Sequence, residues 1–135
     1  MKREDIREKT MQLVYQMDIT GDFDVADLCV VEENSKVMGK KQAEETLQAV
    51  SSHHEEIDAI IADNLDRWTI DRIGRTDLAI LRTAVAEMMY IDSIPRGVSI
   101  NEAVDLAKKY GDERSYAFIN SVLSKIDKKL EAAAD

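Results

Sequence analysis

Residues 76–88 read TDLAILRTAVAEM, and this stretch decides the fold class. Its apolar side chains recur three and four positions apart, which is the spacing of one face of an α-helix. Thr76 or Asp77 is a candidate N-terminal cap, because a short polar side chain can accept a hydrogen bond from a free backbone N–H group. The stripe predicted to face inward consists of Leu78, Leu81, Val85 and Met88, widened by Ile80 and Ala84.

The same period continues on both sides of this stretch. Helices are predicted from about residues 3–18, 24–36, 41–66, 99–110 and 115–130, with a tight connection from Trp68 to Gly74. Ser99 and Glu102 have the spacing of a capping box, and Gly111 suits a left-handed helix end. Trp68 is expected to anchor the connection in the core. The chain is therefore predicted to be all-α, with residues 1–135 forming a single domain: a compact bundle of six or seven helices in two three-helix halves.

The composition supports this expectation and excludes several classes of protein. Among 135 residues there are five glycines, one proline and 5% aromatic residues, too few for a β-sandwich or barrel. No apolar run approaches the roughly 18 residues of a membrane span, and no secretory signal is apparent, so a cytoplasmic protein is expected. Cys29 is the single cysteine, which excludes an internal disulfide and a thiolate metal cluster.

Charge is unevenly distributed along the chain. The formal net charge is −9, but residues 10–107 carry eight basic and nineteen acidic groups, whereas residues 108–130 carry six and three. A protein that is acidic overall does not bind nucleic acid with its whole surface, because clustered Lys and Arg are needed to neutralise the phosphates. The two ends of the chain are thus basic or neutral and the middle is strongly acidic.

One stretch of the predicted 41–66 helix has the residue types of a metal site. His54, Glu55 and Asp58 resemble a zincin helix with Asp in place of the second His. His54 falls on the apolar stripe, however, and no third ligand is recognisable. We favour a packed histidine on a solvated acidic helix, and predict no metal, no cofactor and no catalytic residue.

Two groups of residues are candidates for binding RNA. Arg3 and Arg7 are four residues apart, so on a helix they share a face and could span neighbouring phosphates, or simply pair with the interleaved acids. Near the other end, an aromatic ring at Phe118 can stack on an unpaired base and the amide of Asn120 can read a base edge. A phenylalanine in a helix is more often a core residue, and both alternatives stay open for Phe118.

The second half of the chain closely resembles the NusB family of bacterial transcription antitermination factors. The motifs are Trp68 with Asp71-Arg72-Ile73 and Asp77, then Ala79-Ile80-Leu81-Arg82 with Glu87, Ile94-Pro95, Val98 to Val104 with Asn101-Glu102-Ala103, Leu106 to Gly111, and Ser115 ahead of Phe118 to Leu123. The N-terminal Arg7-Glu8 with Tyr15-Gln16 and Asp18 is similar to that family's first helix.

The resemblance implies a function without catalysis. Proteins of that family pair with NusE, a small-subunit ribosomal protein, bind the boxA element of nascent RNA, and help RNA polymerase to read through terminators, chiefly in ribosomal RNA operons. Carried over by position, RNA binding falls to Lys2, Arg3, Arg7, Tyr15, Phe118 and Asn120. The contact with NusE falls to Asp77, and a monomer or weak homodimer is implied.

Two departures from the family pattern bear on RNA binding. Glu4 and Asp5 interrupt the basic N-terminal run, and Ser121 stands where a glycine is usual. Weak RNA binding by the isolated chain, strengthened by NusE, is therefore expected. The alternatives are a helical oligomerisation module without RNA specificity and, from another class, an RNA methyltransferase with a NusB-like domain, for which 135 residues leave no space.

Overall fold

The computed structural model describes residues 2–29 and 35–134, and within them every regular element is helical. The elements are α1 (Arg3–Thr20), α2 (Val25–Cys29), α3 (Ser35–Met38), α4 (Lys41–Asp63), the 3₁₀ turn η2 (Ile70–Arg72), α5 (Arg75–Tyr90), α6 (Arg96–Tyr110) and α7 (Glu113–Ala134). The all-α prediction is confirmed. Part of the helix predicted over 24–36 lies outside the described residues; the rest forms α2 and α3.

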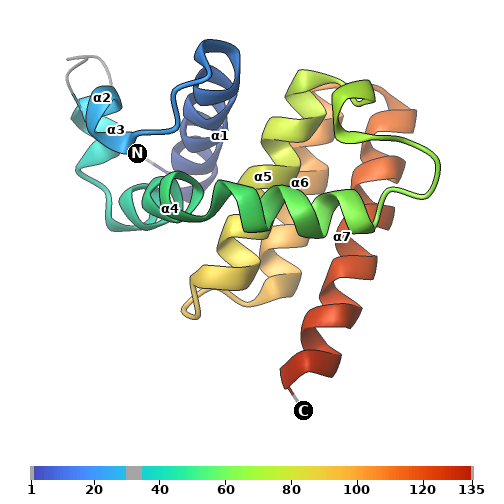
Figure 1. Ribbon diagram of the computed structural model, residues 1–135. Helices are drawn as coiled ribbons and strands as arrows, with labels where there is room; N and C mark the ends of the chain where they lie inside the picture. The colour runs from blue at the N-terminus through green and yellow to red at the C-terminus, as the bar shows by residue number, and fades with distance from the viewer. Residues whose placement is uncertain (1, 30–34, 135) are drawn as a thin grey trace.

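The helices form two halves around one continuous core. In the C-terminal half, α5, α6 and α7 all contact one another, and in the N-terminal half α1 and α4 pack together with the short α2 and α3 (Figure 1). Helix α5 belongs to both halves, because α1 and α4 also pack against it. Its stripe is buried as predicted: Leu78, Ile80, Leu81, Ala84, Val85 and Met88 are each at most 8% exposed.

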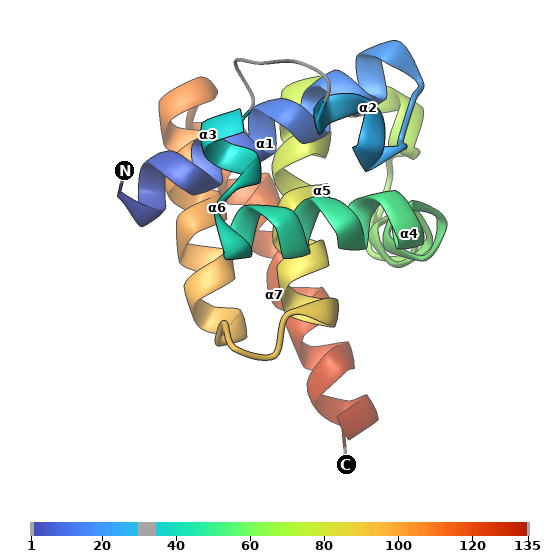
Figure 2. The same ribbon diagram turned by 90° about the vertical axis from the view of Figure 1, so that its left-hand side faces the viewer.

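Helix α4 is sharply bent, which the sequence analysis did not predict. His53 has φ −130° and ψ 21°, outside the helical range. Figure 1 shows the first part of α4 nearly end-on and the second part lying across the view, and Figure 2 reverses the two. At the bend the His53 ring stacks on Tyr90 with ring centroids 4.2 Å apart, so the C-terminal end of α5 supports the bend.

The structure also corrects the predicted start of the helix over 99–110. Helix α6 begins one turn earlier, at Arg96 after Pro95, so Ser99 and Glu102 lie within the helix rather than at its cap. Proline suits this position because its fixed φ favours entry into a helix. Ser99 is 2% exposed, and its hydroxyl donates a hydrogen bond to Glu87 on α5. The two polar side chains therefore connect helices instead of capping one.

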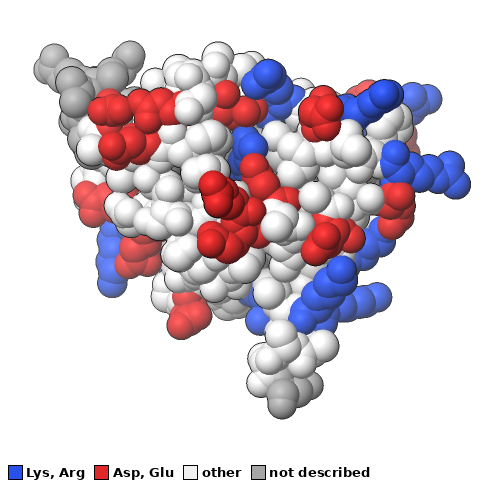
Figure 3. All heavy atoms as spheres, in the orientation of Figure 1, with Lys and Arg blue, Asp and Glu red and all other residues white. Residues whose placement is uncertain are grey.

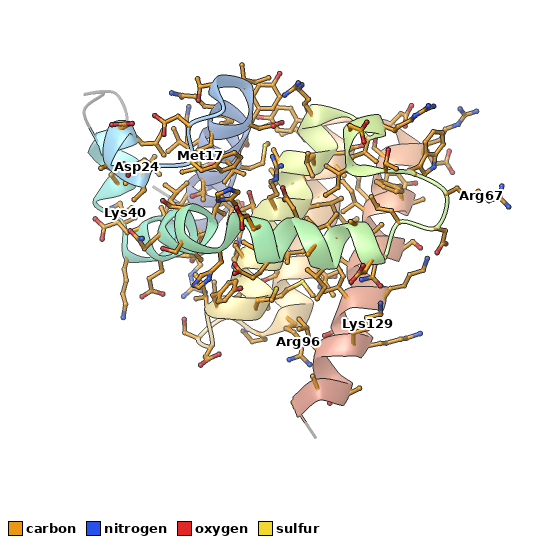
Figure 4. The ribbon with its side chains drawn as sticks, in the orientation of Figure 1. Met17, Asp24, Lys40, Arg67, Arg96 and Lys129 are labelled. Carbon is orange, nitrogen blue, oxygen red and sulfur yellow. The ribbon has the colours of Figure 1, made fainter. Side chains whose placement is uncertain are left out.

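Two further expectations about connections are wrong. Trp68 is 54% exposed, so it does not anchor its loop in the core, and the neighbouring Arg67 points away from the body of the molecule (Figure 4). The loop is held instead by Ile70 and Ile73, which pack against the core. Gly111 ends α6 with φ −126°, not in the left-handed region. A Cβ there would lie 2.6 Å from the Cβ of Ser115, so this glycine allows a close approach.

Candidate nucleic-acid interface

Arg7 is buried between α1, α5 and α6 rather than exposed. It is 5% exposed, and its Nε lies 3.3 Å from Oε1 of Glu87, which is itself 2% exposed. Its Nη1 lies 3.5 Å from Oε1 of Glu102 on α6. Arg7 also lines a groove of about 300 Å³ together with Arg3. Through its contacts with Glu87 and Glu102, Arg7 links α1 to α5 and α6, and its predicted contact with RNA phosphate stays a prediction.

The environment of Glu87 shows how closely these helices pack. Burial raises the pKa of the Glu87 carboxyl above its usual value, opposed by the Arg7 charge and the Ser99 hydrogen bond. A buried carboxylate without such partners is strongly unfavourable. Sequence reasoning missed this site, although one signal was present: Glu87 interrupts a stretch that is otherwise almost entirely apolar.

A second ion-pair network holds the opposite end of α1. Arg82 is 5% exposed and makes two 2.8 Å hydrogen bonds to Asp58 on α4. Its Nη1 lies 3.4 Å from Oδ1 of Asp18, which also pairs with Arg75. Asp58, which the sequence offered as a candidate metal ligand, thus forms an ion pair with the guanidinium of Arg82.

His54 of that candidate and the neighbouring His53 both stack on aromatic rings. His54 stacks on Phe23 with centroids 4.4 Å apart, and His53 stacks on Tyr90 and pairs with Glu56. Across residues 2–29 and 35–134, no group of three or more His, Cys, Asp or Glu side chains is arranged to hold a metal ion. The structure gives this helix a packing role.

Tyr15 lies on the face of α1 that meets the end of α6. Glu8, Gln12 and Tyr15 follow one another at helical spacing, and both Glu8 and Gln12 hydrogen-bond the hydroxyl of Tyr110. Lys109 also donates to Glu8, with Nζ–Oε1 at 2.7 Å. Tyr15 is 37% exposed beside this cluster, so its ring is available at the surface where α1 and α6 adjoin.

Asn120 and Phe118 lie on different sides of α7. Asn120 is exposed and lines a groove between α6 and α7. Phe118 is half-buried, packs against the core and does not line that groove. Two positions along a helix turn through about 200°, which places the two side chains nearly opposite each other. Phe118 therefore does not share the groove with Asn120, and its packing supports the core alternative.

The groove beside Asn120 has a volume of about 630 Å³ and will be called the α6–α7 groove. Its lining residues are Asn101, Val104, Asp105, Lys108, Tyr116, Ala117 and Asn120. The Lys108 ammonium lies 5.3 Å from the centre of the Tyr116 ring. The combination of amides, a cation and an aromatic ring suits an unpaired nucleobase.

The predicted N-terminal arm lies apart from this groove. Lys2 and Arg3 are exposed, and Arg3 lines a smaller groove of about 300 Å³ together with Lys41 and the connection around Pro95. This arm extends past the end of α1 that Arg7 fixes.

Asp77 lies in the first turn of α5, where it is half-buried. The Ser115 hydroxyl donates to its Oδ2 at 3.4 Å. Burial raises the pKa of Asp77, and the Ser115 hydrogen bond opposes this. The predicted capping role is not observed, because α5 begins at Arg75 after Gly74 without a side-chain cap.

The surface surrounding these elements is strongly acidic on one side. Figure 3 shows acidic side chains across the middle of the face crossed by α4, with Lys and Arg gathered toward the lower end of α7. Within the described residues no helix is both long and apolar enough to cross a membrane.

Comparison with known proteins identifies the family. Residues 4–128 match the model of the NusB family. This chain belongs to the NusB family. The transcription antitermination protein NusB of Bacillus mycoides is 46% identical over 129 residues, which cover 93% of this chain and 97% of the relative. That of Finegoldia magna is 39% identical over 137 residues, covering 99% of both. Membership confirms the predicted family and the predicted non-enzymatic nature of the protein.

Solved structures of NusB proteins show the same fold. The solution structure of NusB from Aquifex aeolicus is 33% identical, covers all of this chain and 94% of its own, and has a TM-score of 0.79. A crystal structure of the antitermination factors NusB and NusE in complex with double-stranded RNA matches with 34% identity and a TM-score of 0.80, covering 94% of this chain and 96% of that one. The NusB-like fold predicted from sequence is thereby confirmed.

Proposed function

We propose that this protein is an RNA-binding adaptor of transcription antitermination that pairs with NusE and binds boxA-type RNA. In this role it acts in the cytoplasm, within the RNA polymerase antitermination complex, and promotes read-through chiefly in ribosomal RNA operons. The observation that carries the proposal is the 34% identical relative solved with NusE and RNA, which aligns with 94% of this chain.

The geometry supports two different roles for the predicted RNA-binding residues. Tyr15 and Asn120 have side chains available at the surface, and Lys2 and Arg3 extend from the same end of α1 that Arg7 fixes. These four are proposed to contact RNA. Arg7 and Phe118 are proposed to support that surface from within, by ion pairing and by packing.

Asp77 is proposed to contact NusE. It is half-buried at the start of α5, within the acidic middle of the chain, and NusE as a ribosomal protein is expected to be basic. Complementary charge accelerates encounter and disfavours wrong partners. An Asp77→Lys variant is expected to bind NusE more weakly, with Asp92→Lys as the control, since Asp92 is an exposed acid at the opposite end of α5.

A binding titration tests the function directly. Fluorescence anisotropy of labelled single-stranded boxA RNA would be followed with this protein alone, NusE alone, and both together, at several salt concentrations. Tightest binding by the pair is expected, because this chain alone carries 27 acidic against 18 basic groups. If the pair binds boxA RNA no better than a scrambled RNA, the proposed function is wrong.

Sedimentation velocity addresses the alternative of an oligomerisation module. With NusE present, a one-to-one complex is expected, and without it a monomer or weak dimer. Large assemblies of this chain that exclude NusE would instead favour the oligomerisation module without RNA specificity.

A further inference from the structure

The α6–α7 groove combines features that the predicted RNA residues do not explain. Asn101 and Lys108 lie on α6, and Tyr116 and Asn120 on α7, so two helices contribute facing polar groups to one depression. Its volume of about 630 Å³ falls in the range of small-ligand clefts. Asn101 and Asn120 are both exposed, and among the described residues neither amide makes a side-chain hydrogen bond to the rest of the protein.

The aromatic ring in this groove is that of Tyr116, not Phe118. Tyr116 is half-buried and packs against the core, and the Lys108 ammonium lies over its ring, 5.3 Å from the ring centre. Lys108 is exposed, and its flexible stem allows the ammonium to leave the ring. A base that takes its place gains a stacking surface, and the displaced ammonium becomes available to a phosphate of the same nucleotide.

We propose that the α6–α7 groove is a pocket for a single unpaired RNA base, which stacks on Tyr116 and is read by the amides of Asn101 and Asn120. Lys108 contacts the adjoining phosphate. The proposal rests on the proposed function, because it assigns a base-specific subsite within the RNA surface. It differs from the sequence-based prediction in giving the stacking role to Tyr116 instead of Phe118.

The position of the groove supports RNA over a protein partner as its occupant. Lys108 and Lys109 are exposed at the end of α6, and Lys109 with Tyr110 joins this end to the Tyr15 face of α1. A strand lying on Tyr15 therefore reaches the groove by crossing one helix. Amides that can both donate and accept are suited to the edge of a base, whereas a protein hot spot would be expected to offer a larger apolar area.

The test uses the full chain paired with NusE and single-stranded boxA RNA with 2-aminopurine placed at one position at a time. At one position, binding to the parent protein is expected to quench the fluorescence through stacking. Tyr116→Phe keeps the ring and should retain the quenching. Tyr116→Leu should lose it and bind RNA about fivefold or more weakly, with an unchanged salt dependence.

Matched variants separate the roles of the other residues. Phe118→Leu should keep the quenching, because Phe118 does not line the groove. Trp68→Leu, which removes an exposed aromatic ring outside the groove, is the control and should keep both the quenching and the affinity of the parent. Asn120→Ala should reduce discrimination among bases at the quenched position only. Lys108→Gln should weaken binding to all sequences and lower the salt slope by roughly one.

Each failure has a distinct meaning. If Tyr116→Leu, shown by thermal melting to be folded, keeps both affinity and quenching, the pocket assignment is wrong although the proposed function stands. Loss of quenching in Phe118→Leu instead would return the stacking role to Phe118. Loss of NusE binding by Tyr116→Leu with RNA binding intact would make the groove a protein contact. Absence of RNA binding by the parent pair would contradict the proposed function itself.

Discussion

At Arg7, helical spacing places a guanidinium on the same face as Arg3, yet the structure buries it against Glu87 on α5. The two residues differ in burial: Arg3 is exposed in the first turn of α1, whereas Arg7, one turn later, meets Glu87 and Glu102. A charge in the second position is retained only where an opposite charge meets it.

Replacing Arg7 tests this buried pair. Arg7→Met is expected to lower the free energy of unfolding by about 3 kcal/mol, because it leaves the Glu87 carboxylate buried without its cation. Arg7→Met combined with Glu87→Gln should recover much of the loss, since the amide can still accept from Ser99. Urea unfolding of the single and double variants measures both. A surface arginine would instead change stability by less than about 1 kcal/mol.

The raised pKa of Glu87 predicts a pH dependence of stability. Because burial raises its folded pKa above the ordinary 4.5, the folded protein binds the proton more tightly than the unfolded chain. The resulting stabilisation is complete below the unfolded pKa and is lost as pH rises through the folded pKa. Unfolding free energies of the parent protein should therefore fall, relative to those of Glu87→Gln, as pH rises above about 4.5. Parallel curves for the two proteins would contradict this.

At the scale of the elements, the junction between α6 and α7 is tight at one glycine. A Cβ on Gly111 would lie 2.6 Å from the Cβ of Ser115 and 3.1 Å from the Ala107 carbonyl oxygen. The turn is completed by Asp112, whose Oδ1 accepts hydrogen bonds from the backbone N–H groups of Arg114 and Ser115. The sequence signal for a helix end at Gly111 was sound, but the reason is close approach rather than a left-handed backbone.

Two alanine substitutions distinguish close approach from backbone preference. Gly111→Ala is expected to destabilise the protein by about 1–3 kcal/mol, because Ser115 must shift. Gly97→Ala is the control: it lies in the first turn of α6 with nothing within 4 Å of its added Cβ, and alanine is the better helix former, so stability should rise by up to about 1 kcal/mol. Thermal unfolding compares them. Equal losses in both would show that crowding at Gly111 is not the cause.

For the whole molecule, the uneven charge has a consequence for assembly. With a net charge of −9, concentrated in residues 10–107, the protein attracts basic partners and repels RNA over most of its surface. The basic groups near the end of α6, on the N-terminal arm and toward the lower end of α7 are then the places where a polyanion can approach (Figure 3). NusE supplies the positive surface that this chain lacks, according to the proposed function.

The predicted outcome is a strong effect of salt on association with NusE. The association rate, measured by stopped-flow fluorescence of the exposed Trp68, is expected to fall steeply as ionic strength rises, with a smaller change in the dissociation rate. Asp77→Asn should reduce that salt dependence while Asn101→Ala leaves it unchanged. A rate independent of salt would contradict electrostatic attraction as the driving force.

The sequence by itself determined the fold class, most helix positions and the family. These follow from local properties: the three-and-four spacing of apolar residues and the order of several motifs, which do not depend on how the helices pack. The predicted stripe of α5 is buried, but only the packing of α1, α4, α6 and α7 around this helix buries its other faces as well, so that every residue from Leu78 to Met88 is buried.

Only the tertiary structure decided what the polar residues do. Ser99 and Glu102 have capping-box spacing, but α5 and α1 offer Glu87 and Arg7 as partners once the helices pack. Trp68 is exposed because Ile70 and Ile73 already fill the core beneath its loop. The α6–α7 groove needs two helices to exist at all. A polar side chain selects among several partners that become available only in the folded chain, whereas an apolar one needs merely to leave water.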